Sequence, residues 1–493
     1  MSASTFSVYD MIKRNAMLFP DETAIVDGEK SLTFHQFFIE VNSLASEISR
    51  CGVKASQSVA ALAMNRYEYL ALYGATSAIG AILVPLNWRL SQDELGYIIE
   101  DSGSKILFFD STQRQIADSL KCEKRVDISC FDKRESCDFT PFCHKKDDIF
   151  TLIYTAAVAG KPRGAALSHN NIIASNLQTS LTMNIGKSDT YLNMLPLFHI
   201  TGMNLSLAVM QMGGKNVIME KFNAQEALKI IENQRVTLMA SFPPILTNIM
   251  EEIDKAERTY DISSLKHTVG IDSPQNIATF CEKTSSRFWI LYGQSETSGF
   301  VTLSDALESP GSAGRQCCIS NMAIVDENGA TVPSGESGEI AVRGPLVFQG
   351  FWKNGGFDTS TIRNGWHFTG DVGRIDSNGY LWFEGRKPEK ELIKPGGENV
   401  YPAEVESVIL EHPDVGATSV IGVPDPKFGE GVKAICVLKS GSELSAKELI
   451  EFVGSRIARY KKPGYVEFVE SLPKKNDGSI DRKKVKELYG SVH

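Results

Sequence analysis

The chain has 493 residues, of which 42% are hydrophobic and 23% charged. This composition is ordinary for a globular protein, and the length is too great for one hydrophobic core. The net charge of −9 speaks against a nucleic-acid partner or an anionic membrane surface. The nine cysteines form no Cys-x-x-Cys pair, so we expect neither a zinc site nor a disulfide framework, and we expect a cytoplasmic location.

The first twenty residues lack the apolar segment that is typical of a signal peptide. The most apolar run covers residues 70–86, and Gly74, Gly80 and Pro85 interrupt it. It is too short and too broken to span a bilayer comfortably. We therefore expect no transmembrane segment.

Strand and helix patterns alternate through the first 300 residues. Thr33 and Gln36 form a capping-box pattern, and apolar residues then recur at helical spacing as far as Gly52. Another helix is expected to begin at Asn170 or Asn171, since both are good N-caps. Strands are expected at 58–63, 106–109, 149–154, 191–197, 216–219, 237–241 and 288–291, and helices at 70–80 and 224–233. This alternation predicts an α/β fold with largely parallel sheets flanked by helices.

The predicted secondary-structure pattern changes at about Gly311 and again at about Arg386. Short strands and glycine-rich turns follow first, and a compact α+β pattern follows from about Arg386, with helices at 403–410 and 446–458 and strands at 418–423 and 431–438. We expect a large N-terminal domain over 1–385, including a small β-rich subdomain at about 311–385. A small α+β C-terminal domain is expected over 386–493, with a hinge near 386–390.

The stretch from Gly365 to Pro402 is the densest in unusual residues. It contains Asp371, Arg386 and the pair Gly396-Gly397 between two turn signals. A simple hairpin needs none of these at fixed places, so we interpret the stretch as a nucleotide site beside a hinge.

Four motifs in order resemble the adenylate-forming superfamily, which includes acyl-CoA synthetases, nonribosomal-peptide adenylation domains and firefly luciferase. They are Leu195-Pro-Leu-Phe-His199, Leu291-Tyr-Gly-Gln-Ser-Glu-Thr297, Phe368-Thr-Gly-Asp371 with Glu384-Gly-Arg386, and Gly396-Gly-Glu-Asn-Val-Tyr-Pro402. The resemblance covers nearly the whole chain and is nearest to the fatty and aromatic acyl-CoA ligases. It implies that the C-terminal domain is mobile and that ATP, Mg²⁺ and coenzyme A are used.

The implied reaction converts a carboxylic acid and ATP into an acyl-adenylate and pyrophosphate, after which coenzyme A displaces AMP. By resemblance, the acid is aromatic or of medium chain length. The partners are therefore the small-molecule acid, ATP and coenzyme A, and the sequence is also compatible with a homodimer.

The resemblance assigns roles around the nucleotide. Tyr292 would stack on adenine, Gly293 would let the backbone approach the nucleotide, and Gln294 follows them in the motif. Ser295 keeps the hydroxyl for phosphate, and Glu296 would hold Mg²⁺ with Thr155.

The remaining positions surround the acid and the acceptor. His199 matches the aromatic–histidine gate of the acyl pocket, which Thr201, Gly202 and Met203 would border. Asp371 would bind the ribose, and Arg386 would reach ribose or phosphate and mark the hinge. Gly396 and Gly397 would line the tunnel for the pantetheine arm of coenzyme A.

The chain departs from the family in several places. The phosphate loop reads Thr155-Ala-Ala-Val-Ala-Gly160-Lys161-Pro-Arg163-Gly164 and has lost several hydroxyls, so weaker ATP binding is expected from Thr155, Gly160, Lys161, Arg163 and Gly164. Ser479 stands where the family has a catalytic lysine, and Pro388 lies near the usual pivot. Residues 270–274 match the adenine-lining segment only in part.

Two alternatives to a coenzyme A ligase follow from these departures. One keeps adenylation and transfers the acyl group to an amine or a carrier-protein thiol. The other is an impaired homologue that binds nucleotide or acyl-CoA without turnover. The presence of His199, Glu296, Asp371 and Arg386 favours the coenzyme A ligase.

Overall fold

The computed structural model describes residues 5–129, 139–155, 161–353, 355–387, 392–398, 400–474 and 480–491. In this part of the chain, eight strands form a first sheet in the order β14-β13-β12-β11-β9-β10-β1-β2. Their bounds are β1 Thr23–Asp27, β2 Lys30–Thr33, β9 Thr190–Asn193, β10 Lys215–Ile218, β11 Leu238–Ser241, β12 His267–Gly270, β13 Arg287–Gln294 and β14 Gly299–Asp305. The inner strands pair in parallel, whereas β2 and β14 are antiparallel edges.

A second sheet of eight described strands has the order β18-β17-β8-β7-β4-β3-β5-β6. Its strands are β3 Ser58–Leu62, β4 Ile82–Pro85, β5 Ile106–Phe109, β6 Lys124–Asp127, β7 Ile149–Thr155, β8 Arg163–Ser168, β17 Phe351–Lys353 and β18 Gly356–Asp358. The run from β7 to β6 is parallel. β7, β4, β3 and β5 are apolar over nearly their whole length, as expected where helices cover both faces, whereas the edge strand β6 is mostly charged.

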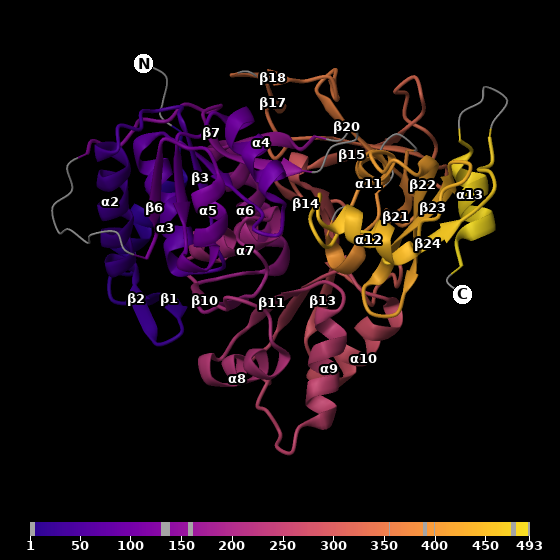
Figure 1. The fold of residues 1–493 in the computed structure, drawn as a ribbon. Coiled ribbons are helices and arrows are strands. Elements are labelled where there is room, and N and C mark those ends of the chain that lie inside the picture. Colours follow the sequence, from indigo (N-terminus) through magenta and orange to yellow (C-terminus); the bar gives the residue numbers. More distant parts are fainter. Residues whose placement is uncertain are drawn as a thin grey trace.

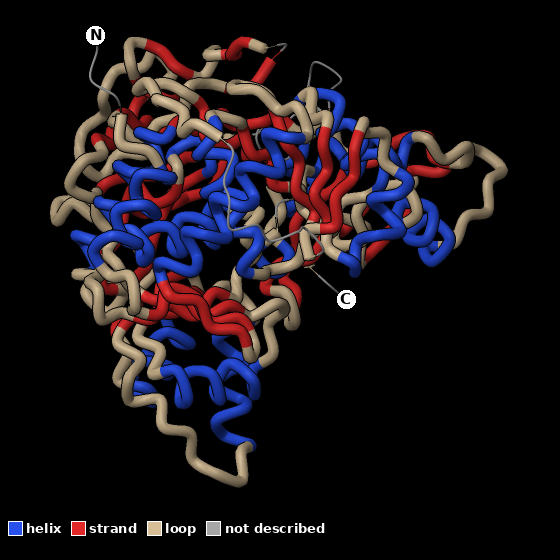
Figure 2. Tube along the Cα trace, turned by 90° about the vertical axis from the view of Figure 1, so that its left-hand side faces the viewer, coloured by secondary structure: helices blue, strands red, loops and turns tan. Residues whose placement is uncertain are grey.

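Helices cover these sheets through apolar faces. α1 Val8–Leu18, α2 Phe34–Arg50 and α3 Tyr67–Ile79 share a core with one face of the second sheet, and α4 Gln92–Ser102 and α5 Arg114–Ser119 pack on its other face. α7 Ile200–Gln211 packs on β9 and β10 of the first sheet and contacts α1. α8 Ala224–Gln234, α9 Ile245–Lys255 and α10 Pro274–Thr284 lie below the first sheet in Figures 1 and 2. α6 His169–Met183 packs beside α7.

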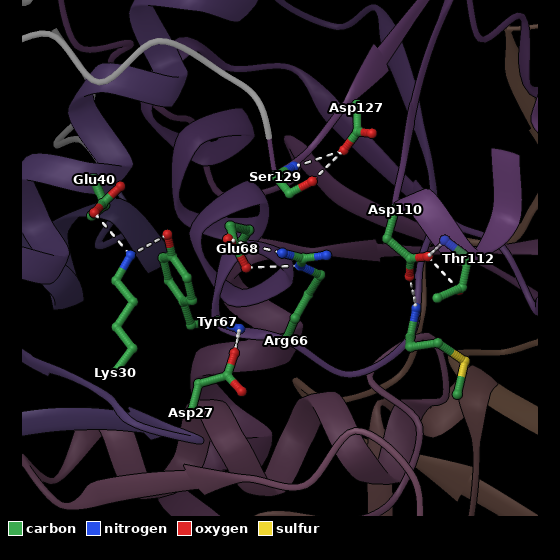
Figure 3. Close-up of polar contacts among 11 residues, drawn as sticks. Asp27, Lys30, Glu40, Arg66, Tyr67, Glu68, Asp110, Thr112, Asp127 and Ser129 are labelled. Carbon is green, nitrogen blue, oxygen red and sulfur yellow. Dashed lines mark hydrogen bonds and ion pairs between the residues drawn. The ribbon is translucent and has the colours of Figure 1, made fainter.

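The junction of the two sheets is tied at the N-terminus of α3. Asp27, the last residue of β1, accepts a hydrogen bond from the backbone N–H of Tyr67 at 3.0 Å (Figure 3). A carboxylate at this end of a helix is favoured by the helix dipole. Arg66 pairs with Glu68 at 2.8 Å, and Lys30 contacts both Glu40 and the Tyr67 hydroxyl. One sheet therefore caps a helix that belongs to the other.

A smaller β-rich sheet follows in the chain. It contains β15 Asn321–Val325, β16 Gly338–Arg343, β19 Ile362–Arg363, β20 Trp366–Ile375 and β21 Leu381–Arg386. The C-terminal residues form a separate sheet, β22-β23-β24, of Val415–Asp425, Gly429–Leu438 and Tyr465–Phe468, with α11 Pro402–Leu410, α12 Ala446–Gly454 and α13 Arg482–Tyr489. We call residues 392–491 of this unit the cap (yellow in Figure 1).

The structure confirms the α/β fold with a separate small C-terminal domain. The capping box of Thr33 and Gln36 is also present. The expected helix start at Asn170 or Asn171 is wrong, because Ser168 is the N-cap and Asn171 is the residue that completes its capping box. The strand expected over 191–197 ends at Asn193. The domain boundary and hinge at 386–390 remain predictions, and residues 388–390 lie outside the described residues.

Within the described residues, no helix is both long enough and apolar enough to cross a membrane.

Candidate functional site

Asp371 and Arg386 face each other across the hairpin of β20 and β21. Arg386 Nε lies 2.9 Å from Asp371 Oδ1. The carboxylate is only 1% exposed and also accepts hydrogen bonds from the Tyr292 hydroxyl at 2.8 Å and from Gln294 Nε2 at 2.6 Å. Burial alone would lower the pKa of Arg386, but the charge of Asp371, together with Tyr401, Tyr292 and Glu296 nearby, raises that pKa overall. The predicted ribose acid is thus held rigidly by residues of two motifs.

The Tyr-Gly-Gln segment ends β13 against β14. A Cβ atom on Gly293 would lie 1.9 Å from the carbonyl oxygen of Gly299, so only glycine fits this close approach. The Tyr292 ring is buried, and its centroid lies 6.3 Å from that of Phe383. Burial, with Asp371 nearby, raises the pKa of Tyr292. The local sequence therefore fixes an aromatic wall beside Asp371.

This wall borders a cavity of about 290 Å³. Apolar side chains and backbone form most of it, and charged groups stand at one end. Its lining includes Ile271, Asp272, Pro274, Ile277, Leu291, Tyr292, Gly311, Asp371, Phe383, Arg386 and Lys394. Residues 271–274, which match the family's adenine-lining segment only partly, do lie on this wall. This cavity has the size and polarity suited to a flat heterocycle with a polar tail.

A second cavity, of about 310 Å³, begins at the same charged end. Its lining includes Thr155, Arg163, His199, Thr201, Phe242, Ile271, Gly293, Gln294, Ser295, Glu296, Phe300, Arg386, Lys394 and Gly397. Gly293, Arg386 and Lys394 border both cavities. A reactant that fills one cavity therefore meets, at Lys394 and Arg386, a reactant that fills the other.

His199 is the N-cap of α7, and its Nδ1 accepts a hydrogen bond from the N–H of Thr201 at 3.2 Å. The ring faces the open cavity, but protein surrounds that cavity. Burial, with smaller contributions from the nearby charges of Lys394 and Arg89, lowers the pKa of His199 to about 4. The imidazole is thus neutral at physiological pH, with its Nδ1 already used as an acceptor.

Two of the predicted pocket residues lie elsewhere. Among the described residues that line the larger cavity, Thr201 is present but Gly202 and Met203 are not. Met203 is fully buried in the core between α7 and the second sheet. A Cβ on Gly202 would lie 2.3 Å from the carbonyl oxygen of Pro196. Both residues support the loop that carries His199, because helical spacing points them away from the cavity.

The phosphate-loop residues are only partly assembled. Thr155, at the end of β7, and Arg163, at the start of β8, line the larger cavity. Arg163 is held by Asp358 at 2.5 Å and by the Phe351 ring. Lys161 lies over the Tyr97 ring at 5.0 Å. Gly164 packs against the Tyr154 ring, and the predicted residue Gly160 lies outside the described residues, as does Ser479.

The cap contributes the other side of the larger cavity. Gly397 lines it, and Gly396, at φ +59°, donates its N–H to the carbonyl oxygen of Phe428 at 3.0 Å. Lys394 also lines the cavity, and its backbone N–H binds Glu430 at 2.7 Å. Burial lowers the pKa of Lys394, and the charge of Arg386 lowers it further. Sequence reasoning missed Lys394 because it reads as a turn residue, although its position two residues before Gly396 was a usable signal.

Among the described residues there is no cluster of three or more His, Cys, Asp and Glu side chains that could hold a metal. Glu296 and Thr155 nevertheless line the same cavity. One carboxylate and one hydroxyl facing a cavity fit Mg²⁺, which usually takes one or two protein ligands together with substrate phosphates.

Comparison with known proteins gives matches over almost the whole chain. The model of the AMP-binding enzymes matches residues 12–352, and the model of their C-terminal domain matches residues 404–479. Feruloyl-CoA synthase from Amycolatopsis sp is 32% identical over 97% of this chain and 98% of its own. The 2-succinylbenzoate–CoA ligase from Bacillus thuringiensis subsp. konkukian is also 32% identical, with the same coverage of each chain.

Two solved structures of o-succinylbenzoate CoA synthetase from Bacillus subtilis, each 28% identical, cover 98% of this chain and 99% of their own. A double mutant bound to the product analogue OSB-NCoA superposes with a TM-score of 0.88. The complex with the acyl-adenylate OSB-AMP gives 0.72. At equal identity and coverage, the present structure is therefore more similar overall to the product-analogue complex than to the acyl-adenylate complex.

Proposed function

Because the chain belongs to the family of AMP-binding enzymes, we propose that it joins a carboxylic acid to coenzyme A with the use of ATP. In the first step, a carboxylate oxygen of the acid attacks the α-phosphorus of ATP, so that an acyl-adenylate forms and pyrophosphate leaves. In the second, the sulfur of coenzyme A attacks the acyl carbon. A thioester forms, AMP leaves with the electron pair of the broken C–O bond, and the thiol proton is released.

One observation carries this proposal: the cap closes over the His199 cavity with Lys394 and Gly397, in the arrangement that gives a TM-score of 0.88 with the product-analogue complex. A ligand in the larger cavity would lie between His199 on the N-terminal domain and Lys394 on the cap. Closure of this kind excludes water from a reactive acyl-adenylate.

The smaller cavity is proposed as the adenosine site. Tyr292 and Ile271 offer apolar faces to the base, and the Asp371 carboxylate is suited to accept from ribose hydroxyls. Ribose binding requires Asp371 to exchange its present partners, Tyr292 and Gln294, in part. Arg386 pairs with this carboxylate and, at the junction of the two cavities, can reach the α-phosphate.

The junction of the cavities is proposed as the reaction centre. Lys394 and Arg386 bring two cationic side chains to the place where the acyl-phosphate bond forms and breaks. Positioned charges of this kind stabilise the charge that develops on phosphate oxygens. Glu296 and Thr155 would hold Mg²⁺, which neutralises phosphate charge when bound, and Arg163 and Ser295 are placed to bind phosphate oxygens. Neutral His199 shapes the entrance to the acyl pocket.

The acid is proposed to be aromatic. Phe242, Phe300 and Leu291 line the larger cavity, and both relatives named above carry the names of aromatic acids. The size of the cavity suits a single substituted ring better than a long chain. Gly396 and Gly397 are proposed to border the path of the pantetheine arm.

The compartment is proposed to be the cytoplasm. The seven cysteines in the described residues are free, as expected in a reducing environment.

The test is to supply purified protein with ATP, Mg²⁺, coenzyme A and a panel of cinnamic, benzoic and medium-chain acids. Exchange of labelled pyrophosphate into ATP and acyl-CoA detected by mass spectrometry are the expected results. Amide or carrier-protein products in place of acyl-CoA would change the acceptor. No exchange with any acid would overturn the proposal and support the impaired homologue.

A further inference from the structure

Lys461 joins the cap to the N-terminal domain through a buried ion-pair group. Its side chain is 1% exposed and lies in the cap between α12 and β24. Nζ is 2.5 Å from Glu404 Oε1 on α11 of the cap, and it also contacts Glu94 Oε1 on α4 of the N-terminal domain. One ammonium group is therefore shared by carboxylates from both domains.

A capping box at the start of α4 holds the side chain of Glu94 beside Lys461. Glu94 is the third residue of α4, and its Oε2 accepts the backbone N–H of Ser91 at 2.7 Å in a capping box. The capping bond uses one carboxylate oxygen and leaves the other for Lys461. Burial raises the pKa of Glu404. Burial also acts to raise the pKa of Glu94, but the charge and hydrogen bond of Lys461 and the hydrogen bonds from Ser91 together lower it. Glu94 therefore carries the negative charge that balances Lys461 across the interface.

This contact depends on the arrangement of the domains. If the cap moves, Lys461 keeps Glu404, which belongs to its own domain, and loses Glu94. A buried ammonium group that loses one of its carboxylates is costly, whereas Glu94 would simply return to water at a helix end. Arg89, on the N-terminal domain, makes a second ion pair with Glu398 of the cap. The free energy of these pairs is thus available only in the closed arrangement.

The ion-pair group also lies close to the site. A third cavity, of about 70 Å³, is lined by Lys461, Tyr460, Glu398 and Gly397 together with His199 and Ser295. It connects the domain interface to the centre where the thioester would form. A change in the position of Lys461 would therefore alter the wall of this passage.

We propose that Glu94 and Lys461, with Glu404 behind them, form an interdomain catch that holds the cap closed for transfer of the acyl group to coenzyme A. The catch deepens the proposed function and depends on it for its role in catalysis. Glu94 and Lys461 are positioning residues, because they touch each other across the domain interface and line neither of the two larger cavities. The acyl-adenylate complex of the relative superposes on this structure less well than the product-analogue complex, with TM-scores of 0.72 and 0.88. In this proposal the adenylate-forming step does not require the catch.

The test separates the two half-reactions in Glu94→Gln and Lys461→Met. We expect pyrophosphate exchange to stay within about twofold of the wild type, and transfer from preformed adenylate to coenzyme A to fall about tenfold, which is the effect of losing one charged hydrogen bond. Glu100→Gln, an exposed change on the same helix, is the matched control and should alter neither rate. Equal losses in both half-reactions would indicate a merely structural role and overturn the proposal.

Hydrogen exchange provides a readout that needs no substrate. In Glu94→Gln, amides of residues 87–94, 396–398 and 457–464 should exchange faster together, whereas those of the two large sheets should not change. Unchanged exchange at the interface would overturn the catch even in an active enzyme. Failure of the wild-type protein to make acyl-CoA would instead overturn the proposed function.

Discussion

Arg386 and Asp371 are opposite each other on β21 and β20, and their side chains form an ion pair at 2.9 Å inside the protein. Arg386 is the last residue of β21, and the chain continues from Lys387 towards the cap. Arg386 also borders both cavities. Backbone pairing therefore places the cation at the predicted hinge against the carboxylate that is proposed to bind ribose.

Removal of Arg386 should destabilise the fold as well as the reaction. In Arg386→Met the Asp371 carboxylate stays buried without its cation, and the cost of breaking such a pair is about 3 kcal/mol. Urea denaturation measures this loss, and pyrophosphate exchange should fall with it. Arg374→Met removes an ion pair of the same hairpin, with Glu384 at 3.1 Å, that is one-third exposed, and should cost under about 1 kcal/mol. Similar losses in both variants would contradict the special role of the buried pair.

Much of this site could be predicted from the sequence because its motifs are local. Tyr292-Gly-Gln, Asp371 and Arg386 each lie on a strand end or hairpin, and the structure brings all of them together. The pairing of Asp371 with Arg386 was not predictable, since it depends on the turn at 376–379 and on a register shift between Val372 and Gly373.

Other features depend on tertiary contacts and were not predicted from the local sequence. Lys394 resembles a surface residue of a turn until the cap folds it against Arg386. Ser168, Asn170 and Asn171 are all good N-cap residues, so the sequence does not show which of them caps α6. The N-cap is Ser168, because β8 continues through this residue and the helix follows directly. Met203 follows His199 closely in sequence, yet helical geometry turns it into the core.

Gly293 should tolerate no side chain. In Gly293→Ala the new Cβ would meet the Gly299 carbonyl oxygen at 1.9 Å, so β14 must shift and the Tyr292 wall with it. We expect a loss of about 2 kcal/mol in stability and a large rise in the KM for ATP. Gly96→Ala is the control, because a Cβ there meets nothing within 4 Å in the middle of α4, and it should stabilise the protein by about 0.5 kcal/mol. A Gly293→Ala protein with wild-type stability would contradict this packing.

His199 should remain neutral far below the pH at which histidine is normally protonated. Its pKa is lowered to about 4, mainly by burial, so between pH 6.5 and 4 the unfolded state binds more protons than the folded state. The contribution of His199 to the free energy of unfolding therefore falls as the pH falls from 6.5 to 4. NMR titration of the imidazole, assigned by comparison with His199→Asn, should give a midpoint well under 5. A midpoint near 6.5 would show that the cavity is more open to solvent than the structure indicates.

Lys394 should be the cap residue on which acyl transfer depends most. Lys394→Met keeps the length of the side chain and removes the cation that faces Arg386 and the His199 cavity. Loss of such a positioned charge typically lowers kcat about 100-fold. Saturating coenzyme A should not restore the rate, because the variant has lost stabilisation of the transition state and not affinity for coenzyme A. Rapid-quench measurement of thioester formation from preformed adenylate checks this. Lys427→Met, on the cap beside Phe428, should be silent, and a Lys394→Met enzyme that transfers at the wild-type rate would place the reacting bond away from the junction of the two cavities.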